Sequence, residues 1–105
     1  MLTDVKKLLE TTGMSVAETC FLRPPSLPYI IFIEEIEFRG SDHKNCIANR
    51  DISVELYSSK INKEKENLIE KLLDDKSIEY RKNRTWIKSE ELFQTVYDFY
   101  LIEKV

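Results

Sequence analysis

The start of the chain carries apolar side chains at helical spacing. Between Val5 and Thr12 they recur at intervals of three and four, so the pattern predicts an amphipathic helix over residues 3–12 with one buried face. Thr3 is predicted to cap the first turn of this helix. Gly13 follows at a place where a left-handed residue commonly ends a helix.

Two segments in the middle of the chain alternate between apolar and polar residues, which is the period of a β-strand. Residues 29–38 are apolar on both faces in their first half and on one face in their second half, and residues 51–57 alternate throughout. No helical pattern separates them, so we expect an antiparallel hairpin. Its polar connection is expected at about residues 40–50, with 46–48 extending the hairpin arm, and a short strand at 17–22 is expected before the pair.

The second half of the chain predicts one more helix and two more strands. Residues 62–74 carry an apolar stripe at helical spacing with Asn62 as the cap, and residues 78–87 and 93–102 are the predicted strands. The predicted fold class is α+β, a mainly antiparallel sheet of four to five strands with two helices packed on one face, in the order α-β-β-β-α-β-β. No linker or internal repeat interrupts the pattern, which indicates a single domain over residues 1–105.

The composition is typical of a soluble globular chain, with 42% hydrophobic and 33% charged residues among 105. No apolar run approaches the roughly 20 residues that span a bilayer, so we expect no membrane contact and a location in the cytoplasm. The two cysteines, Cys20 and Cys46, are far apart and form no CxxC pair. We expect them to be free, buried thiols.

The chain lacks the residue combinations typical of an enzyme. His43 is the only histidine, and it lies in the polar connection without Cys, Asp or His ligands at metal-binding spacing. Two glycines in the whole chain exclude a phosphate-cradling loop. We therefore predict no enzymatic activity, no cofactor, no metal and no small-molecule substrate. The competing hypothesis is a small hydrolase or nuclease built around Glu35, Glu37 and His43, although two carboxylates on one strand face are more commonly a solvated surface.

One cluster combines basic and aromatic residues, namely Arg81, Lys82 and Arg84 with Tyr80 and Trp86 beside them. This combination suits single-stranded nucleic acid. In a regular strand, however, Arg81 points to the opposite face from the other two basic residues, and a net charge of −3 disfavours phosphate binding. We do not expect a nucleic-acid partner, and the alternative is a positive strip that meets an acidic patch on a protein.

Several segments along the chain are similar in sequence to segments of a known protein family. The segments are residues 28–32, 38–42, 44–45, 52–57 with Lys60, 69–73, 86–87, 89–90 and 97–99, and they include the triplets ELY at 55–57 and YDF at 97–99. In this order they resemble the small tail-terminator, or tail-completion, proteins of long-tailed bacteriophages and their prophages. The resemblance implies an α+β domain without enzymatic activity that assembles into a ring, commonly a hexamer, at the head-proximal end of the tail. Its implied partners are copies of itself, the tail tube protein and the head-completion or connector proteins, and its implied locations are the host cytoplasm during assembly and then the virion.

The polar connection is the contact surface that this resemblance implies. In such proteins a projecting hairpin loop contributes to contacts between subunits or with the tube. The candidate interface residues are Arg39, Asp42, His43, Lys44 and Arg50, whose mixed charges suit the heterologous contacts that close a ring. The alternative function is a small, non-enzymatic adaptor or regulatory module that binds proteins and dimerises through the free face of its sheet.

Overall fold

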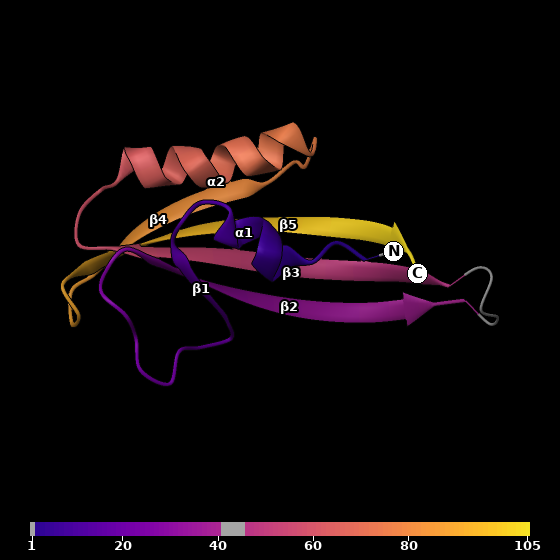
Figure 1. Cartoon of the computed structure of the whole chain (residues 1–105), viewed down its shortest axis with the longest axis horizontal. Coiled ribbons are helices and arrows are strands. Elements are labelled where there is room, and N and C mark those ends of the chain that lie inside the picture. Colours follow the sequence, from indigo (N-terminus) through magenta and orange to yellow (C-terminus); the bar gives the residue numbers. More distant parts are fainter. Residues whose placement is uncertain (1, 41–45) are drawn as a thin grey trace.

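The computed structural model describes residues 2–40 and 46–105, which form an α+β fold (Figure 1). The elements are α1 (Val5–Glu10), β1 (Ser15–Glu18), β2 (Tyr29–Arg39), β3 (Ile47–Ser58), α2 (Lys63–Asp75), β4 (Arg81–Ile87) and β5 (Leu92–Lys104). Within the described residues, five strands form one sheet in the order β1-β2-β3-β5-β4. β1 and β2 run parallel, and the other neighbouring strands are antiparallel. The predicted fold class and the predicted order of elements are confirmed.

One apolar core lies between the two helices and one face of the sheet, which we call the helix face. Residues of even number in β2 and β3 and of odd number in β5 point to this face. The core contains Val5 and Leu9 of α1, Met14, Val16, Ile30, Phe32, Ile52, Val54, Leu56, Ile69 and Leu73 of α2, Tyr97 and Phe99. No helix covers the opposite face among the described residues, and we call it the open face. Neither helix is long and apolar enough to cross a membrane.

Helix α1 begins later than the sequence pattern predicts. Its cap is Asp4 rather than Thr3, because the Asp4 carboxylate accepts the backbone N–H of Lys7 at 3.1 Å. Thr3 has another role, since its N–H and its hydroxyl both donate to Glu103. Gly13 has a φ of 86°, the left-handed conformation expected of the residue that ends this turn.

Strand β1 lies closer to the N-terminus than the predicted range of 17–22. The strand ends where Thr19 adopts a positive φ of 70°, which turns the chain away from the extended direction. Cys20 follows this turn and is exposed, while Cys46 is partly exposed, and both are free thiols. The prediction of buried thiols is therefore wrong for Cys20, because the strand that was expected to bury it has already ended.

β3 begins at Ile47, so the predicted extension of the hairpin arm over residues 46–48 is confirmed for Ile47 and Ala48. One later boundary differs from its prediction. β4 begins at Arg81 instead of residue 78, because Ile78 packs against the core and bonds to α2 through its backbone N–H before the chain enters the sheet.

The outer strands cover only one half of the sheet. β1 pairs with the first residues of β2, and β4 pairs with the first half of β5. Beyond these points β2, β3 and β5 continue as a three-stranded ribbon, which we call the arm, formed by residues 33–39, 47–53 and 99–104. Figure 1 shows the arm extending away from α2, with both marked chain ends beside it.

Candidate subunit interface

Arg50 ties the three strands of the arm together. Its guanidinium donates to Glu34 on β2 and to Glu103 on β5, with an Nη2–Oε1 distance of 3.0 Å and an Nη1–Oε1 distance of 2.6 Å. The same guanidinium donates to the carbonyl oxygen of Thr3 at 2.7 Å, and the Thr3 hydroxyl donates to Glu103 at 2.6 Å. These four residues, which we call the arm clasp, therefore join β2, β3, β5 and the N-terminal segment.

The clasp is buried and electrostatically matched. Arg50 is 5% exposed. The hydrogen bond to Glu34 raises the pKa of Arg50 above its usual value. Burial raises the pKa of Glu103, but the hydrogen bonds from Thr3 and Arg50 outweigh it and lower that pKa below its usual value. The predicted place of Arg50 in an exposed connection is therefore wrong, because Glu34 interrupts the apolar face of β2 to bind it.

The remaining predicted interface residues belong to the end of β2 and to the connection after it. Arg39 is exposed on the open face and has no ion-pair partner among the residues of known position. Arg50 points to the helix face, so these two residues do not share a surface. Asp42, His43 and Lys44 lie outside the described residues.

The carboxylates of the competing hydrolase hypothesis lie on the open face of the arm. Glu35 and Glu37 are exposed, and they stand opposite Asp51 and Asn49 of β3. His43 lies outside the described residues. Across residues 2–40 and 46–105, no group of three or more His, Cys, Asp or Glu side chains is arranged to hold a metal ion.

The basic cluster is divided between the two faces of β4. Lys82 and Arg84 point to the helix face and donate to Glu66 of α2, at Nζ–Oε1 2.9 Å for Lys82 and Nη2–Oε1 2.6 Å for Arg84. Thr95 donates to the same carboxylate at 3.0 Å. Arg81 is exposed on the open face, as its opposite orientation in the strand predicts. Two of the three charges are thus neutralised inside the chain.

Glu66 is a buried residue that sequence reasoning missed, because its position in the first turn of α2 is typical of an exposed, dipole-stabilising acid. Its side chain is 2% exposed. The hydrogen bonds from Arg84 above all, and from Lys82 and Thr95, lower its pKa to about 2 although burial raises it. The only sequence signal for this site is the pair of basic residues on one face of β4.

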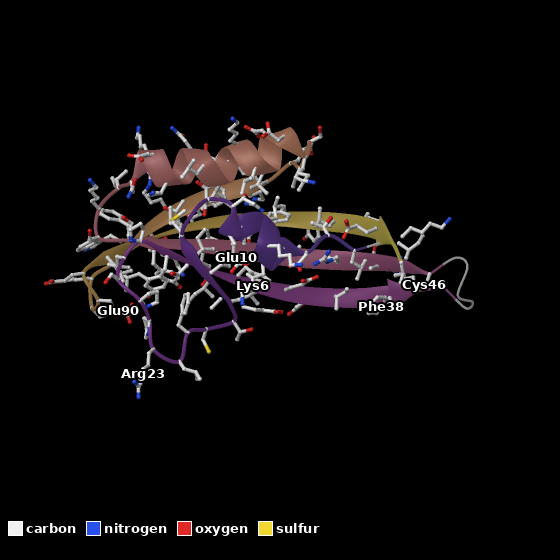
Figure 2. All side chains as sticks on the ribbon, viewed as in Figure 1. Lys6, Glu10, Arg23, Phe38, Cys46 and Glu90 are labelled. Atoms are coloured by element: carbon white, nitrogen blue, oxygen red, sulfur yellow. The ribbon has the colours of Figure 1, made fainter. Side chains whose placement is uncertain are left out.

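The arm exposes six large apolar side chains among the described residues. They are Ile33, Ile47, Tyr100 and Ile102 on the open face and Ile36 and Phe38 on the helix face, where neither helix covers them. Figure 2 places Phe38 and Cys46 toward the far end of the arm. A groove of about 400 Å³ crosses the open face here, and Glu35, Glu37 and Asp51 are among the residues that line it. Exposed apolar side chains that gather in this way mark a surface for protein contacts.

Comparisons with known proteins identify a likeness of fold. No family model matches the sequence, and no curated protein matches it. A solved structure described as the virion of a native gene transfer agent particle contains a chain that is similar in structure, with a TM-score of 0.58 and 12% sequence identity. The match covers 90% of this chain and 82% of that one.

Proposed function

We propose that the chain is a structural virion protein of the tail-terminator or head–tail joining type. The observation that carries the proposal is the likeness of fold to a chain from a gene transfer agent virion, which extends over 90% of this chain. The segments that resemble tail-terminator proteins support the same role from the sequence, independently of the fold. In this role the chain forms a ring, commonly of six copies in the family that it resembles, at the head-proximal end of a tail.

The arm is the element that we assign to contacts with other virion proteins. It extends beyond the helices and exposes apolar side chains that the core does not use. Arg39 ends strand β2, and Asp42, His43 and Lys44 follow it in the sequence before β3. The mixed charges of these residues suit a heterologous contact between subunits. The proposed partners are other copies of the chain, the tail tube protein and the head-completion proteins.

We infer a non-enzymatic role without a cofactor, a small-molecule substrate or a nucleic-acid partner. The buried ionisable groups support this inference, because Arg50 and Glu66 are held in ion pairs with residues of the same chain. Their partners are residues of the same chain, so these groups stabilise the fold. The basic cluster supports it as well, since only Arg81 presents its charge on the open face.

Deletion of the gene tests the role in the virion. In a strain that makes particles and encodes this chain, we expect electron micrographs of the deletion mutant to show heads and tails that are not joined. Expression of the chain from a plasmid should restore complete particles. Complete particles at normal yield from the deletion mutant would refute the virion role and favour the adaptor alternative.

Charge reversal tests the proposed contact residues in the same complementation assay. The variant Arg39→Glu with Lys44→Glu should fold, as judged by circular dichroism, and should not restore particles, because its reversed charges oppose those of the partner surface. The control is Lys6→Glu with Lys71→Glu, which changes the net charge equally at two exposed helical positions. Full restoration by the Arg39 and Lys44 variant would exclude the connection as a contact.

A further inference from the structure

Half of strand β5 has an unpaired edge. β4 begins at Arg81, which stands opposite Asp98, so residues 99–104 have β3 on one side and no strand among the described residues on the other. The N–H of Val105 donates to the carbonyl oxygen of Cys46, next to β3. Successive residues of a strand direct their backbone groups to opposite sides. The N–H and C=O groups of Tyr100 and Ile102 therefore point to the free edge.

The side chains on this edge are unusually apolar and exposed. Tyr100 and Ile102 are each 74% exposed, and both lie on the open face. A groove of about 850 Å³ borders the edge, lined by residues 76–81 and 98–102, and it reaches over the open face to Asp51 and Ser53 of β3. An unpaired edge with apolar side chains and space beside it is a template for a further strand.

The free edge of β2 is different in character. Beyond its pairing with β1 it carries the exposed acids Glu35 and Glu37. Charged residues of one sign on an edge strand repel a second copy of the same edge and prevent its pairing. The β5 edge has no such protection at Tyr100 and Ile102, so of the two free edges it is the one suited to pairing with itself.

We propose that β5 of a second copy pairs with this edge in an antiparallel manner, about a two-fold axis at Ile102. β4 occupies the space beside Asp98, so the added strand has room only from residue 99 onward. A two-fold axis normal to the sheet sets even-numbered residues against even-numbered ones, with Ile102 opposite Ile102 of the second copy and Tyr100 opposite Lys104. The outward N–H and C=O groups of the two Ile102 residues then bond to each other, and the two sheets become continuous.

The occupant of this edge is a second copy because the edge is self-complementary. Isoleucine meets isoleucine at the axis, and the tyrosine ring lies against the stem of a lysine. A two-fold contact closes at two copies and cannot by itself build a ring. The pairing is therefore proposed for the chain outside a virion. Its test does not depend on the virion role proposed above.

Charge substitution at the axis tests this pairing by light scattering over a concentration series. The wild-type chain should have the mass of a dimer, whereas Ile102→Lys and Ile102→Glu should each be monomers, because each sets like charges opposite one another. An equimolar mixture of the two variants should recover the dimer mass, since residue 102 then meets its opposite charge. Leu22→Lys and Leu22→Glu are the controls, because Leu22 is 98% exposed in the connector before β2 and should leave the dimer intact.

Three results would overturn the proposal. They are a wild-type chain that stays monomeric up to about 1 mM, single Ile102 variants that keep the wild-type oligomer, and a mixture of the two variants that stays monomeric. If Ile102→Lys forms the same rings as the wild-type chain, the variant keeps the wild-type oligomer. That result would overturn the pairing at β5 without contradicting the virion role.

Hydrogen exchange gives an independent readout at single residues. The amides of Tyr100 and Ile102 should be protected in the wild-type dimer and should exchange rapidly in Ile102→Lys. Ile36 and Phe38 on the free edge of β2 are the internal control and should exchange equally in both proteins. Protection of Ile36 and Phe38 without protection of Tyr100 and Ile102 would overturn the proposal and place the contact between copies on β2.

Discussion

The carboxylate of Glu66 is predicted to be a major source of stability, and Glu66→Gln tests it. The substitution keeps the size of the side chain but removes the negative charge that binds Lys82 and Arg84. Four hydrogen bonds of 2.6 to 3.0 Å end on this carboxylate, and one of them comes from the buried Thr95. Removal of one member of a buried ion pair leaves the remaining charges without compensation.

The magnitude follows from the pKa of Glu66. The pKa falls from its ordinary 4.5 to about 2 in the folded chain, and at roughly 1.4 kcal/mol for each pH unit this difference corresponds to about 3 kcal/mol. Because the folded pKa lies below the unfolded one, this stability is present above about pH 4.5 and is lost as the pH falls toward 2. We therefore expect Glu66→Gln to destabilise the fold by about 3 kcal/mol at pH 7 and by roughly half as much at pH 3.

Urea denaturation followed by circular dichroism at both pH values measures the two differences in free energy of unfolding. The control is Glu10→Gln, an exposed glutamate at the end of α1 (Figure 2), which should change stability by less than about 0.5 kcal/mol. A loss below about 1 kcal/mol at pH 7 would refute the reasoning, and so would a loss that does not shrink at pH 3. Either result would mean that water screens the Glu66 site more strongly than its burial indicates.

Two further substitutions test the other buried polar contacts by the same denaturation assay at pH 7. Arg50→Met removes the cation of the arm clasp and leaves Glu34 and Glu103 together without it, so we expect a loss of about 3 to 5 kcal/mol; a loss below about 1 kcal/mol would show that the clasp does not hold the arm. Tyr97→Phe removes a hydroxyl that donates to Glu70 at 2.7 Å, and we expect a loss of about 1 to 2 kcal/mol. If Tyr97→Phe is as stable as the wild-type chain, the hydrogen bond between Tyr97 and Glu70 contributes no more to stability than hydrogen bonds to water would.

The repeating patterns of the sequence predicted the elements of the fold and the faces that they bury. Alternation along β2 and β3 predicted the hairpin, and the orientation of Arg81 away from Lys82 and Arg84 was also predicted correctly. These features depend on local periodicity, which a single segment contains in full. Boundaries were less accurate where one backbone angle decides them, as with Thr19 at the end of β1.

The ion pairs could not be predicted, because their partners are distant in the sequence. Arg50 binds Glu34, Glu103 and the backbone of Thr3, from three different segments. A charged residue in the sequence appears solvent-exposed unless its partner is known, so Arg50 was assigned to a surface loop. The position of Glu34 in an otherwise apolar strand face was the available sign, since a buried carboxylate requires a cation.

The clasp also explains why the arm is able to expose apolar side chains. Most protein segments become rigid by burying such side chains in a core, and the other half of this sheet does so under α1 and α2. The arm buries Ile52 and Phe99 at its base, and beyond them Arg50 and its partners join its strands. Phe38, Tyr100 and Ile102 stay uncovered. A ribbon that is held by an internal ion pair keeps one shape before it meets another chain, so little conformational entropy is lost on binding. On this reasoning we expect the clasp to hold the proposed contact surface in shape, although none of its side chains need touch a partner.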